Sequence, residues 1–199
     1  SLIFVPKEYI EYDVLKSEGL KAVRYAVNKI DASIPSKYLI KLSDSKANSL
    51  REFQNIFIRS RLQLIGMTHG IMEYILKNIK KYSKNEIKFV EWEIKEIEKR
   101  YEASKIMYDY TCNNISPDKS VSDKLMEANI IKSLSTDYTY EAARTAQKLL
   151  GAKGFESGHP MSNIAIDFRP FTIFEGPNDM LYADIYDQFS KATAEEKKM

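Results

Sequence analysis

The sequence IRSRLQLIGMTHGIMEYILKNI, residues 58–79, decides the fold of this chain. Its apolar residues recur at steps of three, four and seven, which is the spacing of one face of an α-helix. Two neighbouring stripes make that face wide: Ile58, Leu62, Ile65, Met72, Leu76 and Ile79, beside Phe53, Phe57, Leu64, Ile71 and Ile75. So wide a face predicts a central helix from about Asn48 to Lys81. We interpret His69, within the first stripe, as a hydrogen-bonded boundary residue of the core and not as a catalytic group.

A second helix is predicted over residues 84–112. Its apolar face comprises Ile87, Val90, Ile94, Ile97, Tyr101 and Tyr108. The opposite face is rich in glutamate and lysine, which is typical of a helix surface in contact with water. No metal-ligand spacing stands out among these carboxylates, and we expect no metal site.

A third helix is predicted after the break at Ser116-Pro117-Asp118. Ser120 or Ser122 can cap its start, and Gly151 ends it. The last turns, over residues 142–146, are rich in alanine. Another helix can therefore pack closely against them.

The rest of the chain contributes one more predicted helix. An irregular stretch with Gly154, Gly158 and Pro160 comes first, and a helix of about a dozen residues follows Pro177. The pattern as a whole predicts a mainly α protein. We expect an antiparallel four-helix bundle over residues 45–190 and a frayed tail over residues 191–199.

Residues 1–44 have the pattern of β structure. An apolar run at residues 2–5 ends at Pro6, and residues 22–27 alternate weakly after a turn at Gly19. About three strands are too few to form an independent sheet domain. We therefore expect an incomplete β domain whose remaining strands lie outside this chain, and we expect the 199 residues alone to be inactive.

Composition excludes several classes of partner. Lys plus Arg number 30 and Asp plus Glu number 28, so no overall field attracts nucleic acid or an anionic membrane. No apolar run is long enough to span a membrane. Cys112 is the only cysteine, so no internal disulfide can form, and a reducing cytoplasm is the expected compartment.

The stretch Ile173-Phe174-Glu175-Gly176-Pro177-Asn178-Asp179 carries the candidate catalytic group. Glu175 follows two apolar residues and precedes a glycine, where a ligand can approach the backbone closely, and then a proline that can open a helix. These are suitable conditions for a carboxylate general base. The alternative is that Glu175 only complements the positive end of the next helix, an effect of about 0.3–1 kcal/mol.

Three motifs resemble the C-terminal part of the flavin-dependent acyl-CoA dehydrogenases. That family has a Gln-x-x-Gly-Gly-x-Gly-aromatic turn, then Arg-Asp-x-Arg, then Ile-aromatic-Glu-Gly-Thr. The matching segments here are Lys148-Leu149-Leu150-Gly151-Ala152-Lys153-Gly154-Phe155, Ile166-Asp167-Phe168-Arg169 and Ile173-Phe174-Glu175-Gly176-Pro177. The resemblance extends to residues 1–44, which are similar to the last strands of the family's β middle domain.

The resemblance implies a specific reaction. The family oxidises an acyl-CoA thioester: a glutamate removes the Cα proton, and FAD accepts a hydride from Cβ. Glu175 matches that base, and the substrate would contact Glu175 and Gly176. The matching FAD contacts are Gln147, Lys148, Gly151, Ala152, Gly154, Pro177 and Asp179. The resemblance also implies fatty acid metabolism, a homodimer or homotetramer, and an electron-transfer flavoprotein as a possible partner.

The chain departs from the family pattern at several positions. The family's Arg-x-x-Phe-Gly stretch has no counterpart near residues 80–84, and an alternative base position on the first helix corresponds to a residue near Ile56. Other departures are Phe57 for arginine, Lys148 for glutamine, Ala152 for glycine, Ile166 for arginine and Pro177 for threonine. The alternative function is therefore a redox-inactive module that binds acyl thioesters or supports assembly. A third possibility is an unrelated structural bundle.

Overall fold

The computed structural model describes residues 2–82, 87–114 and 118–196. Within these residues lie four short strands: β1 (Leu2–Ile3), β2 (Glu11–Leu15), β3 (Tyr25–Lys29) and β4 (Leu39–Ile40). The α-helices are α1 (Lys46–Tyr82), α2 (Lys88–Asn113), α3 (Val121–Leu149), α4 (Pro160–Asp167) and α5 (Asn178–Glu196). Two 3₁₀ turns matter below, η3 (Gly151–Phe155) and η4 (Arg169–Thr172).

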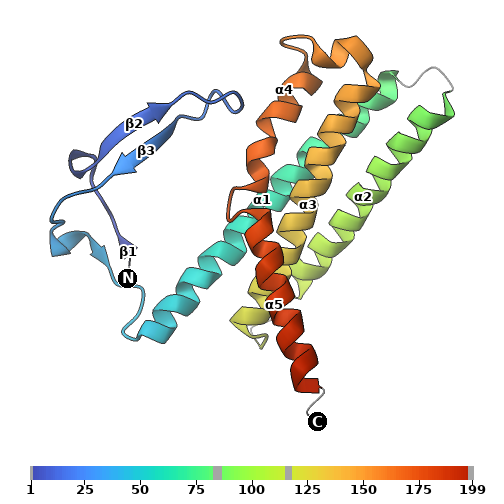
Figure 1. Ribbon diagram of the computed structural model, residues 1–199. Coiled ribbons are helices and arrows are strands. Elements are labelled where there is room, and N and C mark those ends of the chain that lie inside the picture. The colour runs from blue at the N-terminus through green and yellow to red at the C-terminus, as the bar shows by residue number, and fades with distance from the viewer. Residues whose placement is uncertain (1, 83–86, 115–117, 197–199) are drawn as a thin grey trace.

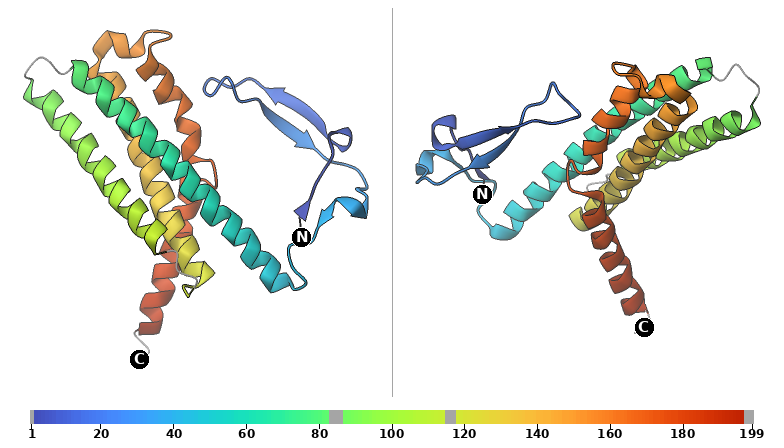
Figure 2. Two further views of the ribbon diagram at one scale, coloured as in Figure 1. Left: turned by 180° about the vertical axis from the view of Figure 1, so that it is seen from behind. Right: turned by 45° about the horizontal axis from the view of Figure 1, so that its top comes forward.

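The helices form the antiparallel bundle that the sequence predicted. Figure 1 shows α1, α2 and α3 side by side, with the chain reversing direction from each helix to the next. α4 and α5 follow each other along α3, and the strands lie to one side of the bundle, with the turn after β2 directed toward α4 (Figures 1 and 2). No described helix is both long enough and apolar enough to cross a membrane.

The helix starts follow from capping side chains. Ser45 Oγ accepts a hydrogen bond from the backbone N–H of Asn48 at 3.1 Å, so α1 begins two residues before the predicted start. Ser120 Oγ accepts from the N–H of Asp123 at 3.1 Å, which confirms one of the two predicted caps of α3.

Two predictions near the end of the chain were wrong. α4 lies within the stretch that we expected to be irregular: Pro160 occupies the first turn, where proline starts a helix instead of breaking it, and His159 caps that turn. Two turns are also too short for an apolar period to be visible. α5 continues to Glu196 and not to about residue 190, because the tail contains good helix formers such as alanine, glutamate and lysine.

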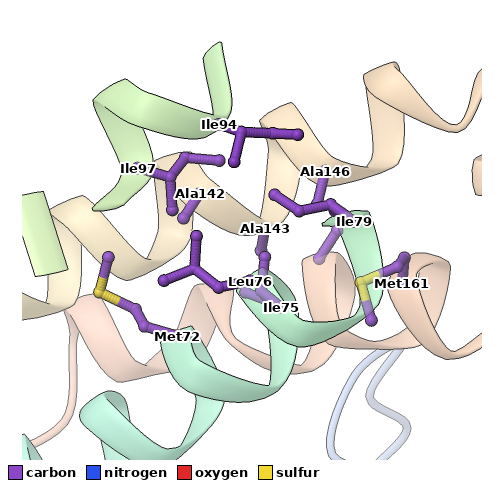
Figure 3. Close-up of a cluster of buried hydrophobic side chains, with 11 residues drawn as sticks. Met72, Ile75, Leu76, Ile79, Ile94, Ile97, Ala142, Ala143, Ala146 and Met161 are labelled. Atoms are coloured by element: carbon purple, nitrogen blue, oxygen red, sulfur yellow. The ribbon is translucent and has the colours of Figure 1, made fainter. Parts of the chain in front are cut away.

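The main core lies between α1, α2, α3 and α4. It contains Met72, Ile75, Leu76, Ile79, Ile94, Ile97, Ala142, Ala143, Ala146, Met161 and Ala165, all buried (Figure 3). The predicted small residues of α3 lie between the isoleucines of α2 and those of α1, which lets these helices approach closely. Each large side chain in this core contributes about 1.5–3 kcal/mol by leaving water.

A second, aromatic cluster joins α1 to η4. Phe168 and Phe171 are buried and their rings stack at a centroid distance of 4.5 Å, against Leu64 of α1. Phe174 continues the row at 5.6 Å from Phe171, and Tyr25 of β3 follows at 6.5 Å from Phe174. This row fixes the segment that leads into Glu175.

The strands form two separate two-stranded sheets, β1 with β4 and β2 with β3, both antiparallel. The expectation of about three strands did not include β2, whose side chains are all exposed although polar and apolar residues alternate from Glu11 to Val14. The turn after β2 lies against α4: the N–H of Leu20 donates to Asp167 Oδ1 at 2.6 Å. A Cβ at Gly19 would lie 2.6 Å from the carbonyl oxygen of Ile166, so only glycine permits this approach.

Candidate active site

Glu175 lies in a tight turn between η4 and α5. Its φ is +59°, and φ of the following Gly176 is +106°. A left-handed conformation at a residue other than glycine costs about 1–3 kcal/mol and persists only where surrounding contacts enforce it. Glu175 is therefore held by its neighbours in a specific, unfavourable backbone conformation.

Two residues of α1 contact Glu175. Ser60 Oγ donates a hydrogen bond to Glu175 Oε2 at 2.5 Å, and Arg61 Nε donates to the Glu175 carbonyl oxygen at 3.0 Å. The half-buried carboxylate is thus oriented by α1 and does not merely project from the end of α5. The sequence comparison pointed to a position near Ile56 for the family's alternative base and to Phe57 in place of an arginine; the residues that meet Glu175 lie one helical turn later.

Arg61 is a buried cation that the sequence analysis missed. It is only 7% exposed, its Nη1 donates to Asn129 Oδ1, and its guanidinium lies over the ring of Phe57. Burial lowers the pKa of Arg61, and the charges of Glu175 and Asp184 oppose that shift. Its position between Ile58 and Ile65 in the apolar stripe was the available signal, because a cation there must have buried partners.

Lys132 of α3 is a second buried cation on the same turn. Its side chain is fully buried, and Nζ donates to the carbonyl oxygen of Gly176 at 2.8 Å and to Asn178 Oδ1 at 2.7 Å. A longer contact, 3.4 Å, joins Nζ to the carbonyl oxygen of Thr172. Burial lowers the pKa of Lys132 to about 8, with a further lowering by the charge of Arg61.

Asn178 extends this network to the surface of the bundle. Its amide nitrogen donates to Asp137 Oδ1 at 2.7 Å, and Tyr182 donates its hydroxyl hydrogen to Asp137 Oδ2 at 2.6 Å. Burial and the hydrogen bond to Asp137 raise the pKa of Tyr182 to about 12. The start of α5 is therefore anchored to α3 by polar groups as well as by apolar packing.

The predicted FAD-contact residues form two separate groups. Gln147, Lys148, Gly151, Ala152 and Gly154 lie at the end of α3 and in η3, whereas Pro177 and Asp179 lie at the start of α5, well below η3 in Figure 1. The chain does not bring the two groups together into one site.

The first of these groups is partly occupied by contacts within the chain. Lys148 Nζ pairs with Glu93 at 3.1 Å and lies over the ring of Phe89. A Cβ at Gly154 would come within 2.0 Å of the Gln147 carbonyl oxygen, so this glycine is required by packing. The expected arginine position near residues 80–84 falls partly outside the described residues, which omit 83–86.

A cavity of about 610 Å³ lies beside Ile173 and Phe174. It is enclosed by the turn after β2, by α3, and by the segment from α4 through η4; its polar and aromatic lining comprises Ser17, Glu18, Tyr25, Tyr140, Arg144, Gln147, Arg169 and Phe174. Among the described residues, neither Arg144 nor Arg169 has an ion-pair partner, and the buried Tyr25 hydroxyl has no hydrogen-bond partner. This lining suits a ligand that combines an aromatic ring system with a negatively charged group.

His69 is a structural residue, as predicted. Its Nε2 shares a hydrogen bond of 2.8 Å with Ser104 Oγ, which in turn bonds Ser135 Oγ at 2.6 Å. Tyr101 and Tyr108 pack edge-on against the imidazole ring. In the described part of the chain, no cluster of histidine, cysteine, aspartate and glutamate could hold a metal ion.

Comparison with known proteins identifies the fold. The family described as "Acyl-CoA dehydrogenase, C-terminal domain" matches residues 50–189. An acyl-CoA dehydrogenase from Geobacillus kaustophilus superposes with a TM-score of 0.80 at 19% identity, over 95% of this chain and 52% of that one. Butyryl-CoA dehydrogenase from Megasphaera elsdenii gives 0.76 at 15% identity, over 91% and 49%.

A third structure, glutaryl-CoA dehydrogenase from Mycobacterium smegmatis in complex with FADH2, gives a TM-score of 0.78 at 12% identity, over 95% of this chain and 50% of that one. The chain thus spans about half the length of the solved structures it matches. No curated protein matches it in sequence. Because the family match covers well over half of its residues, the chain belongs to the acyl-CoA dehydrogenase family, whose C-terminal domain it contains.

Proposed function

We propose that this chain is the C-terminal portion of an FAD-dependent acyl-CoA dehydrogenase, which forms an α,β double bond in an acyl-CoA thioester with Glu175 as the proton-abstracting base. The observation that carries this proposal is the backbone conformation of Glu175. The turn that presents this carboxylate is strained, and it is held by Ser60 and Arg61 of α1 and by Lys132 of α3. A residue that only complemented the positive end of α5 would need no such turn.

The contacts of Glu175 suit proton abstraction. Ser60 holds Oε2, whereas no described residue donates a hydrogen bond to Oε1, which can therefore accept the Cα proton of the substrate. Arg61 and Lys132 donate hydrogen bonds to the backbone carbonyl oxygens of the two turn residues, Glu175 and Gly176 respectively. These contacts hold the base in one position before the substrate binds. Such positioning matters for the rate, since a misplacement of about 1 Å can lower it roughly 100-fold.

FAD supplies the acceptor for the hydride that leaves Cβ. The cavity beside Phe174 suits this cofactor, because Tyr25, Tyr140 and Phe174 offer aromatic surfaces, and Arg144 and Arg169 offer positive charge that no carboxylate of the described residues pairs with. Gln147 joins this lining, which supports its assignment as a contact residue. Pro177 has neither a hydroxyl nor an N–H, and its carbonyl oxygen already accepts from the N–H groups of Met180 and Leu181, so only its ring could contact the cofactor.

The proposal extends to the surroundings of the chain. We place residues 1–44 in a β domain that is completed by strands outside this chain, and we expect the whole protein to form a homodimer or homotetramer. An electron-transfer flavoprotein is the expected electron acceptor. The single exposed cysteine, Cys112, is compatible with a reducing cytoplasm.

The alternative, a redox-inactive protein that binds acyl thioesters or supports assembly, is favoured by one observation. Lys148, at the predicted glutamine position, is paired with Glu93 and is directed toward α2. If the cofactor contacts at this end of α3 are lost, the turn at Glu175 could still bind a thioester without oxidising it.

The absorbance spectrum of the purified full-length protein separates the two functions. We expect a flavin spectrum, as isolated or after incubation with excess FAD, that bleaches when acyl-CoA is added. Arg144→Gln together with Arg169→Gln should weaken FAD binding, whereas Arg100→Gln, which removes an exposed ion pair with Glu141, should leave it unchanged. A protein that binds acyl-CoA but no FAD would reject the oxidoreductase and support the alternative.

A further inference from the structure

Two buried cations from different helices converge on one turn. Arg61 of α1 donates to the carbonyl oxygen of Glu175, and Lys132 of α3 donates to the carbonyl oxygen of Gly176. These are the two consecutive residues with positive φ. Desolvating a cation is costly, so a folded chain keeps two of them here only where they satisfy buried acceptors.

All three N–H groups of the Lys132 ammonium are used. Its acceptors are the carbonyl oxygens of Thr172 and Gly176 and Oδ1 of Asn178. They come from the last residue of η4, from the turn itself, and from the first residue of α5. One ammonium group therefore ties together the whole segment that carries Glu175.

We propose that Lys132 is a positioning residue for Glu175: its ammonium group holds the Glu175–Gly176 turn in the left-handed conformation that presents the carboxylate to the substrate. This inference rests on the proposed function, because positioning matters only if Glu175 acts on a substrate. Lys132 is fully buried and is not itself a catalytic residue.

The charge of Lys132 makes this role dependent on pH. A neutral amine keeps two N–H donors, so deprotonation leaves one of the three acceptors without a partner. The charged groups that act on it are Arg61 from α1, Asp137 from α3 and Glu175 from the turn; in α5, Tyr182 bonds Asp137 and the charge of Asp184 acts on Arg61. Because burial lowers the pKa of Lys132 to about 8, the clamp should weaken as the pH rises through that value.

The substitution Lys132→Met tests the proposal. Methionine has a similar length and no charge, and it removes all three N–H donors, so the protein loses the stability that these buried hydrogen bonds contribute. Lys132→Gln retains two donors and serves as the second variant if the methionine protein does not fold. Lys99→Met, which removes an exposed i,i+3 pair with Glu96, is the matched control.

Hydrogen exchange of the full-length protein gives a readout that does not depend on catalysis. In Lys132→Met we expect the amides of residues 173–176 and 178 to exchange at least about 10-fold faster, with those of α2 changed by less than about 2-fold. Unchanged exchange over residues 173–178 would overturn the proposal. This result stands even for a protein that binds no FAD, so it is separable from a failure of the proposed function.

Flavin bleaching by acyl-CoA gives the second readout. We expect the bleaching rate of Lys132→Met to fall by about 10- to 100-fold, with acyl-CoA affinity within about 3-fold of the wild type. In the wild type the rate should decline as the pH rises through about 8, and this decline should be absent from the variant. A wild-type rate in the variant, or an unchanged pH profile, would overturn the positioning role.

Discussion

Replacing Gly176 by alanine tests the geometry of the Glu175 turn most sharply. The backbone at Gly176 has φ of +106°, which L-amino acids rarely adopt. The added Cβ would lie 3.3 Å from Arg61 Nη2 and 3.4 Å from Leu181 Cδ2. The first contact is tighter than usual, so Arg61 must shift by a few tenths of an ångström, together with its hydrogen bond to Glu175.

The expected loss of stability follows from these two effects. A side chain in a sparsely populated region of φ and ψ costs about 1–3 kcal/mol. For a chain of this size, each kcal/mol lowers Tm by about 2–4 °C. A destabilisation of about 2 kcal/mol therefore corresponds to a Tm lower by roughly 4–8 °C.

Thermal unfolding of Gly176→Ala beside Gly70→Ala provides the measurement and its control. Gly70 lies inside α1 with open space where a Cβ would be, and alanine should stabilise a helix interior by about 0.5–1 kcal/mol. The two substitutions should thus shift Tm in opposite directions. If Gly176→Ala melts at or above the wild-type Tm, the turn does not have the backbone conformation described here.

Three further changes test other parts of the molecule. Ile75→Ala, at a fully buried core position, should lower the free energy of unfolding by about 2–5 kcal/mol in urea denaturation, whereas a loss below 1 kcal/mol would contradict the core of Figure 3. Burial lowers the pKa of His69, so the stability that neutral His69 contributes should be present above the unfolded pKa of about 6.5 and be lost as the pH falls through the folded pKa. Urea unfolding midpoints measured from pH 7.5 to 5 should show this loss of stability. The loss should be smaller in His69→Gln. Ser60→Ala should slow flavin bleaching by roughly 10- to 100-fold, because the carboxylate loses a charge-assisted hydrogen bond that orients it; an unchanged rate would show that Ser60 only fills space.

The long helices were predictable because their apolar period extends over many turns. The apolar stripe from Ile58 to Ile79 predicted α1. The alanines at residues 142–146 predicted that other helices pack closely against α3. The short α4 was not predictable in this way, since eight residues show no clear period and Pro160 has opposite meanings at the start and in the middle of a helix. β2 was missed although polar and apolar residues alternate from Glu11 to Val14, because an alternation of only four residues is a weak signal for a strand.

Only part of the candidate site could be predicted from the sequence. Glu175 was recognisable from its own neighbours in the chain, Phe174 and Gly176. Ser60, Arg61 and Lys132 reach it from 115, 114 and, through Gly176, 44 positions away, and no local pattern connects them with the turn. A cation within an apolar stripe signals that buried acceptors exist, but only the packing of α1 and α3 shows which acceptors these are.

The reduction of bound FAD by acyl-CoA in Glu175→Gln is the most direct test of Glu175 as the base. Glutamine is nearly isosteric and can still accept the hydrogen bond from Ser60, so the turn and the cofactor site should remain intact. We expect the variant to retain FAD and bind acyl-CoA, while the flavin absorbance no longer bleaches. Bleaching at the wild-type rate would contradict the assignment and place the proton-abstracting group elsewhere.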